Sequence, residues 1–210
     1  MTLIKLIVAT VSLCFFSLSL GGCVTGTIEE PKYKILEAEG DFEIREYAPR
    51  IVAETSVSDS FERAPNIGFR RLADYIFGNN TSKQSIAMTS PVAQEPQSEK
   101  IAMTAPVGQE LAKDNLWVIT FTMPSSYTME TLPKPKNPEV ILKQLPASKF
   151  AAVRFTGFNR ANTVESKTQE LAAWLAKKSI QAEGKAIYAR YNPPWTPWFM
   201  RRNEILLQIK

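Results

Sequence analysis

The chain has 210 residues, with 25 Lys and Arg against 21 Asp and Glu, two cysteines and no histidine. The absence of histidine excludes Ser-His-Asp and Cys-His catalysis and histidine ligation of haem iron. With so few thiols it also excludes ordinary zinc sites. The formal net charge of +4 is mild and no basic run stands out, so we predict no nucleic-acid binding. We also predict no metal site and no catalysis.

The N-terminal residues 1–22 have the pattern of a secretory signal. Lys5 supplies the positive charge, and the segment 6–20 is uncharged and apolar but shorter than a membrane span. The stretch Leu-Gly-Gly-Cys that ends at Cys23 resembles a bacterial lipobox, which implies lipidation of Cys23. An ordinary cleaved signal and an uncleaved anchor are the alternatives.

This resemblance predicts the organisation and the location of the protein. We expect a signal peptide at 1–22, a lipidated cysteine and tether at 23–32, and one domain at 33–210. Val24, and not Asp, follows the cysteine, which resembles the default for sorting to the outer membrane. We therefore expect a lipid-anchored protein of the bacterial cell envelope that faces the periplasm from the outer membrane. The remaining cysteine, Cys14, lies inside the signal, so the domain must be stabilised by a packed core and not by disulfides.

The segment 33–58 alternates with a period of two residues, which predicts two or three strands. Phe42 and Ile44 fall on one face, whereas Arg45 and Tyr47 fall on the other. The segment 115–125 shows the same alternation. There the residues Trp117, Ile119 and Phe121 share one face, and Val118, Thr120 and Thr122 share the other.

Two helices are predicted from apolar spacing. In the first, Phe69, Leu72, Ala73 and Ile76 recur at helical intervals, Pro65 suits the first turn and Gly78 suits the stop. The second is predicted over 162–184, where an apolar stripe ends at a glycine. Its stripe contains Val164, Leu171, Trp174, Leu175 and Lys178, with Gly184 as the end.

A heptapeptide is written twice, as IAMTSPV at 86–92 and IAMTAPV at 101–107. The pattern predicts two strands that pair as an antiparallel hairpin, each stopped by its proline. Met88 and Met103 would then share a face. They either fill gaps in the core or line a ligand pocket, since thioethers serve both purposes.

Further strands are predicted at 140–143, 149–156, 185–192 and 203–210, and the proline-rich segment 127–139 is predicted to be a loop. The order is strands, helix, strands, repeated once. This order predicts an α+β fold built from two similar halves with one helix each.

Five motifs in order resemble the SOUL haem-binding family, and together they span roughly residues 33–210. They are FRRLADYIFGNN, IAMTSPV, EKIAMTAPV, WVITFTMPSSYTMETLPKP and YNPPWTPWFMRRNEILLQI. The resemblance implies a distorted antiparallel β-barrel or sheet from two βαββ-like halves, with one helix packed per half. It also relates the domain to bacterial effector-binding modules of the gyrase-inhibitor type, which hold small molecules in a cleft between the halves.

The resemblance implies haem or another tetrapyrrole as the ligand, without histidine ligation. The contacts would be mainly apolar, with Met88, Met103, Tyr127 or another tyrosine as the only reasonable iron ligands. Propionates would need basic partners. The candidates are Arg70, Arg71, Arg201 and Arg202, for which solvated surface positions are the alternative.

The C-terminal segment offers further candidates. Trp195, Trp198 and Phe199 lie on a proline-stiffened stretch that is a pocket lid, a bilayer contact or a loop packed on the sheet. Glu204 begins the last strand. By resemblance to the effector-binding modules it would meet a cationic ligand, and the alternative is a surface charge.

We therefore expect an envelope lipoprotein that binds a flat apolar molecule, haem or another tetrapyrrole first. One alternative is an effector-binding module for non-haem amphipathic or cationic molecules. Another is a small hydrolase that uses Tyr and Glu, and a fourth is a purely structural scaffold.

Overall fold

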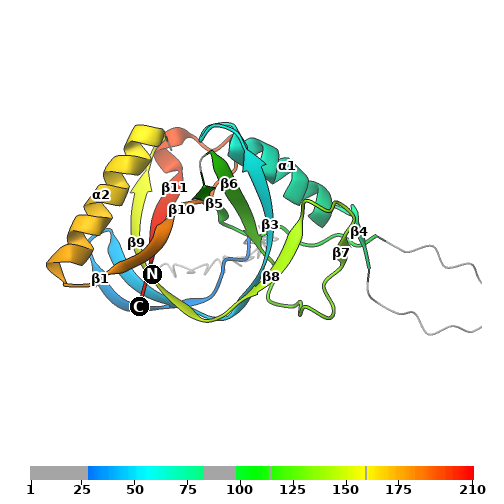
Figure 1. The fold of residues 1–210 in the computed structure, drawn as a ribbon, viewed down its shortest axis with the longest axis horizontal. Coiled ribbons are helices and arrows are strands. Elements are labelled where there is room, and N and C mark those ends of the chain that lie inside the picture. The colour runs from blue at the N-terminus through cyan, green and yellow to red at the C-terminus, as the bar shows by residue number, and fades with distance from the viewer. Residues whose placement is uncertain (1–27, 83–97, 114, 159) are drawn as a thin grey trace, which may run out of the picture.

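The computed structural model describes residues 28–82, 98–113, 115–158 and 160–210. Nine of its strands form one antiparallel sheet in the order β1-β2-β9-β11-β10-β5-β6-β3-β8, and β4 pairs with β7 separately. The sheet curls into a half-barrel, and both helices lie on its outer side (Figure 1). The elements are β1 (Tyr33–Glu39), β2 (Phe42–Tyr47), β3 (Arg50–Ser58), α1 (Ala64–Ile76), β4 (Asn80–Thr81), β5 (Val107–Lys113), β6 (Leu116–Thr122), β7 (Lys134–Pro135), β8 (Ile141–Leu145), β9 (Ser148–Thr156), α2 (Ala161–Lys177), β10 (Ala182–Arg190), a 3₁₀ turn η1 (Trp198–Met200) and β11 (Arg202–Ile209).

The predicted α+β fold of two halves is confirmed. One half is β3-α1-β5-β6 and the other is β9-α2-β10-β11, so each is a βαββ unit with its last strand in the middle. The halves meet where β10 pairs with β5. The halves also exchange the strands that precede them in the chain. Strand β2, which precedes β3, pairs with β9 of the second half, and β8, which precedes β9, pairs with β3 of the first half. Only Ala48 and Pro49 separate β2 from β3, so this short bend links the two halves.

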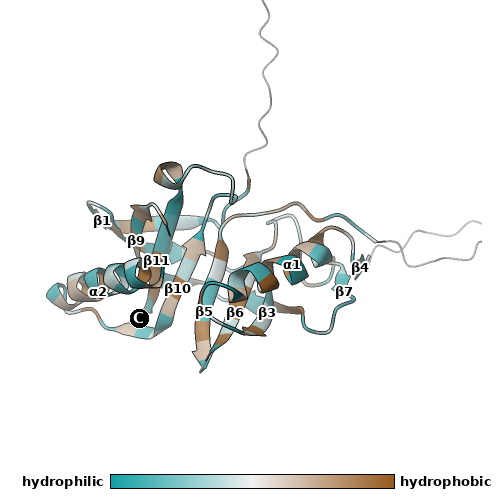
Figure 2. Cartoon of the chain, turned by 90° about the horizontal axis from the view of Figure 1, so that it is seen from above, coloured by the Kyte–Doolittle hydropathy of each residue, from teal (hydrophilic) through white to brown (hydrophobic). Residues whose placement is uncertain are grey.

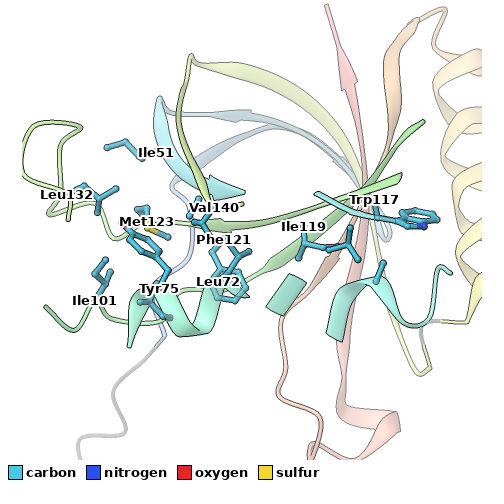
Figure 3. Packing of buried hydrophobic residues seen from close by; sticks show 14 residues of the cluster. Ile51, Leu72, Tyr75, Ile101, Trp117, Ile119, Phe121, Met123, Leu132 and Val140 are labelled. Atoms are coloured by element: carbon cyan, nitrogen blue, oxygen red, sulfur yellow. The ribbon is translucent and has the colours of Figure 1, made fainter. Parts of the chain in front are cut away.

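Helix α1 forms where the apolar spacing predicts it. Pro65 lies in its first turn, and Gly78, with a φ of 125°, follows its end. Its buried face packs against β3 and β6, and a side chain at Gly68 would overlap that of Ile119, so only glycine lets the two elements approach this closely. In Figure 3, Leu72 and Tyr75 of this helix lie beside Phe121 and Met123.

Helix α2 is shorter than predicted, because it ends at Lys177 and not at Gly184. Ser179 has a φ of 57°, and the N–H groups of Ser179 and Ile180 return to carbonyls of the last helical turn. The chain then enters β10, and Gly184, with a φ of 73°, lies at an irregularity in the pairing of this strand. The glycine that suggested a helix end therefore marks a bulge in a strand.

The predicted hairpin of the two heptapeptides is wrong for the second of them. Residues 101–106 form no regular strand, and β5 begins only at Val107, after the proline. The backbone is held by other contacts, since Ile101 N donates to Ile76 O at 2.8 Å and the Thr104 hydroxyl donates to Thr122 O. A proline has no N–H for the ladder, but it can precede a strand as readily as it ends one. The first heptapeptide, with Met88, lies outside the described residues.

The two faces of the sheet have different neighbours. The predicted alternation is confirmed, because Ile44, Ile119 and Phe121 pack in the clusters beneath the helices while Tyr47 lies in a separate cluster on the other face. Seen from above, α1 lies over β3 and β6 and α2 lies beside β9, β10 and β11 (Figure 2). We call the helix-covered side the outer face and the opposite, concave side the inner face. Neither helix in the described part of the chain is long and apolar enough to cross a bilayer.

Candidate functional site

The inner face of the half-barrel is lined with apolar side chains that no helix covers. One of its clusters contains Tyr47, Phe150, Ala152, Ala189 and Leu206. A cavity of about 190 Å³ opens over this surface. Its apolar lining comes from both halves and includes Val52, Val118, Leu145, Phe150, Ile187, Ala189 and Leu206.

A second cavity, of about 460 Å³, adjoins the first. The two share Pro31, Arg50 and Thr122 in their linings. The second cavity is more polar, and its walls are the segment 29–32, the bend between β2 and β3, and the loop that follows β6. Its volume lies within the usual range for small-molecule sites.

Arg50 stands where the two cavities meet. Its guanidinium lies over the rings of Tyr47, at 5.0 Å, and Phe150, at 5.8 Å. Among the described residues, its Nη1 is a buried side-chain nitrogen without a hydrogen-bond partner. Burial lowers the pKa of Arg50, and the phenol of Tyr47 offsets this only in part. A buried guanidinium nitrogen without an acceptor is unfavourable and favours an anionic ligand at this place.

Glu204 lies at the centre of a buried ion network on the same face. It is 1% exposed and accepts hydrogen bonds from Arg45 at 2.6 and 3.1 Å and from Arg202 at 2.9 and 3.0 Å. The Tyr191 hydroxyl donates to it at 2.7 Å. Arg45, in turn, donates to the Tyr47 hydroxyl at 3.3 Å. The network thus extends from β11 across to β2 and reaches the ring that supports Arg50.

The pKa values in this network follow from burial and from charge pairing. Burial alone would raise the pKa of Glu204, but hydrogen bonds and charge from Arg45, with Tyr191 and Arg202, hold it below its usual value. Burial and the neighbouring carboxylate raise the pKa of Tyr191. At neutral pH Glu204 is therefore a charged acceptor whose oxygens are already engaged.

Of the predicted basic residues, Arg70 is exposed on α1 and Arg71 is bound to protein groups. Arg71 donates to Ser56 O at 3.0 Å and pairs with Glu139 at 3.0 Å. Arg201 donates to the carbonyls of Pro194 and Thr196 at 2.6 and 2.8 Å, bracing their loop. These three side chains do not line either cavity.

Met103 and Tyr127 both pack against the cluster beneath α1, but of the two only Tyr127 also lines the larger cavity. The Tyr127 hydroxyl donates to Glu99 at 2.7 Å, and burial together with this carboxylate raises its pKa to about 12. Among the described residues no three His, Cys, Asp or Glu side chains gather as a metal site would require.

Trp195 and Trp198 are strongly exposed, at 82% and 54%, and line neither cavity. Trp198 stacks on Phe158 with ring centroids 5.8 Å apart, and Phe199 meets Trp198 at 5.7 Å. The rings of Phe158, Trp198 and Phe199 therefore form an exposed aromatic group, and Trp195 is exposed on the same loop.

Sequence reasoning missed Arg50 and Arg45. The alternation places Arg45 and Tyr47 on one face, and this pattern could have identified Arg45 as a candidate. The position of Arg50 beside Phe150 depends on the exchange of β2 and β8 between the halves, and no local pattern reports that pairing.

Replacing Glu204 tests the ion network. Glu204→Gln removes the buried carboxylate of Arg45 and leaves it only the partly exposed Glu43, and we expect the free energy of unfolding at pH 7 to fall by about 3 kcal/mol. Because the folded pKa of Glu204 is lowered, its contribution is present above the unfolded pKa near 4 and is lost as the pH falls through the folded pKa. Urea unfolding at several pH values should therefore show wild type losing its advantage over Glu204→Gln in acid. An advantage that does not change with pH would contradict this.

Solved structures share this fold at low sequence identity. The C-terminal domain of EcmrR matches with a TM-score of 0.53 and 12% identity, over 85% of this chain and 98% of that domain. A hydrolase from Listeria innocua matches with a TM-score of 0.54 and 10% identity, over 83% of this chain and 94% of the other. At these identities the likeness concerns the fold alone.

Sequence comparison identifies relatives at the level of the family. Human Heme-binding protein 2 is 29% identical over 86% of this chain and 85% of its own length. The mouse protein of the same name is 24% identical, over 87% of this chain and 91% of its own. The family model described as SOUL heme-binding protein matches residues 28–208. The chain therefore belongs to the SOUL haem-binding protein family.

Proposed function

We propose that the protein binds a flat, largely apolar molecule on the inner face of the half-barrel, with haem or another tetrapyrrole as the first candidate. The observation that carries the proposal is the apolar lining of the inner cavity, drawn from β3, β6, β8, β9, β10 and β11. A surface of this kind binds a planar apolar ligand by excluding water from both. Membership of the SOUL family supports a tetrapyrrole.

The described residues fit the macrocycle better than its iron. Met103 lies on the outer face, and the Tyr127 hydroxyl already donates to Glu99. The chain has no histidine to serve as an axial ligand. The proposal therefore rests on apolar contact with the ring and does not need a bond to iron.

A comparison of haemin with metal-free protoporphyrin IX tests this proposal. We expect closely similar dissociation constants for the two, measured by quenching of tryptophan fluorescence in residues 24–210. Val118→Glu, which places a charge in the inner cavity, should weaken both by about tenfold or more. Ile141→Glu is the matched control, because Ile141 is exposed on β8 and lines neither cavity. Strong binding of haemin alone, or equal effects of the two substitutions, would refute the proposed site.

A cationic amphiphile is the second candidate ligand, because Glu54 and Glu110 also line the inner cavity. Glu54 is paired with Lys143 at 2.5 Å, and burial raises the pKa of Glu110, so the charged form of Glu110 is disfavoured. Glu204 and Tyr191 form the carboxylate–tyrosine pair that a hydrolase would use, but both carboxylate oxygens are held by arginines. We place these two functions behind the first.

We further propose that the protein acts at the bacterial envelope, anchored through lipid on Cys23 and facing the periplasm from the outer membrane. The exposed rings of Trp195, Trp198 and Phe199 suit a position near lipid head groups, where tryptophan is favoured. Cys23 itself lies outside the described residues.

Replacing Cys23 tests the anchor. We expect Cys23→Ser to remove metabolic labelling by radioactive palmitate and to move the protein from the membrane pellet to the soluble fraction. Cys14→Ser is the matched control, since this residue lies within the predicted signal and should leave labelling unchanged. Labelling that persists in Cys23→Ser would contradict the proposed lipidation.

A further inference from the structure

We propose that Arg50 is an anion anchor, and that the ligand of the inner face carries a carboxylate or similar anionic group at one edge of its apolar body. This inference rests on the proposed ligand site and adds the charge and the orientation of the ligand.

Arg50 lines both cavities at the place where they meet, and its Nη1 is buried without a hydrogen-bond partner in the part of the chain that the structure describes. No ion pair to Arg50 is present among the described residues. An arginine always stays charged, so a buried donor of this kind gains most from an anionic acceptor.

Three carboxylates near Arg50 have other partners. Glu29 accepts from Ser125 N at 2.9 Å, and Glu30 pairs with Arg202 at 3.0 Å. Glu204 is held by Arg45 and Arg202. None of these three carboxylates forms an ion pair with Arg50, and the charge of Glu29 is countered by Lys32, which lines the same cavity.

The inner cavity changes in polarity along β3. Arg50, Val52 and Glu54 follow one another at alternate positions and all line this cavity. Four residues of strand separate Arg50 from Glu54, which is about 13 Å. Glu110 lies at the same end of the cavity as Glu54. Strand β3, which carries Glu54, and strand β5, which carries Glu110, lie on either side of β6, and Val118 of β6 lines this part of the cavity. The site is thus basic at one end and apolar in the middle, and at the other end it has two carboxyl groups, of which Glu54 is paired with Lys143.

This arrangement orients an amphipathic ligand. Its anionic edge would meet Arg50 at the bend between β2 and β3, and its apolar body would lie over Val52, Phe150 and Leu206. The reverse orientation would place the anionic edge beside the carboxyl groups of Glu54 and Glu110 and would leave Arg50 without an acceptor. A macrocycle with carboxylates on one edge only has the required shape and charge.

Three porphyrins with the same ring test the anchor: protoporphyrin IX, which is a dianion, its neutral dimethyl ester and a cationic amide formed with dimethylaminopropylamine. We expect wild type to bind the dianion about tenfold more tightly than the ester and to bind the cation most weakly. Arg50→Met should bind the dianion and the ester alike while leaving the affinity for the ester unchanged. Arg50→Lys, which keeps a point charge, should restore part of the preference.

The possible outcomes separate the two proposals. If wild type binds none of the three porphyrins, the proposed function fails. If wild type binds all three equally, or if Arg50→Met keeps the preference for the dianion, the ligand site stands but the anchor is refuted. Retention of ester binding in Arg50→Met shows that this variant is folded, so loss of the preference cannot be assigned to unfolding.

Discussion

The buried ion pair between Arg45 and Glu204 is the interaction on which the arrangement of the inner face depends. It joins β2 to β11 across β9, and each partner is at most 2% exposed. Two charges removed from water this completely persist only when hydrogen bonds satisfy them, and here Arg202, Tyr191, Glu43 and Tyr47 do so. The pair thereby fixes the last residues of β2, immediately before the bend that leads to Arg50.

The same constraint explains how a duplicated fold gains an asymmetric site. The two βαββ units are alike in topology, but only the second contains Glu204 and only the strand exchanged from the first brings Arg45 to it. Tyr47 then extends the network to Arg50, whose guanidinium lies over its ring. The acidic residues Glu54 and Glu110 lie at the other end of the inner cavity. The difference between the two ends is what gives a bound molecule a direction.

Local patterns predicted the elements well and the site poorly, for a physical reason. Alternation assigned Trp117 and Val118 to opposite faces, and helical spacing located α1, because both depend on neighbours along the chain. The doubled heptapeptide identified the family, but Ile101 and Met103 belong to a loop that packs beneath α1 and not to a hairpin. Glu204 was recognised as a candidate from resemblance, but its partner Arg45 is 159 residues away. A pairing across that separation is set by the order of the strands, which the periodicity of one segment cannot reveal.

The central claim is that the ligand lies on the inner face and not beneath the helices. Methyl NMR of residues 24–210 during titration with protoporphyrin IX tests it directly, because the ring current of the macrocycle shifts nearby methyl signals. The largest shifts should appear at Val118, Ile187 and Leu206, which line the inner cavity, while Val164 and Leu175 on the buried face of α2 should barely change. Shifts concentrated at Leu72, on the buried face of α1, and at Met103, which packs against the same cluster, would contradict the inner-face site.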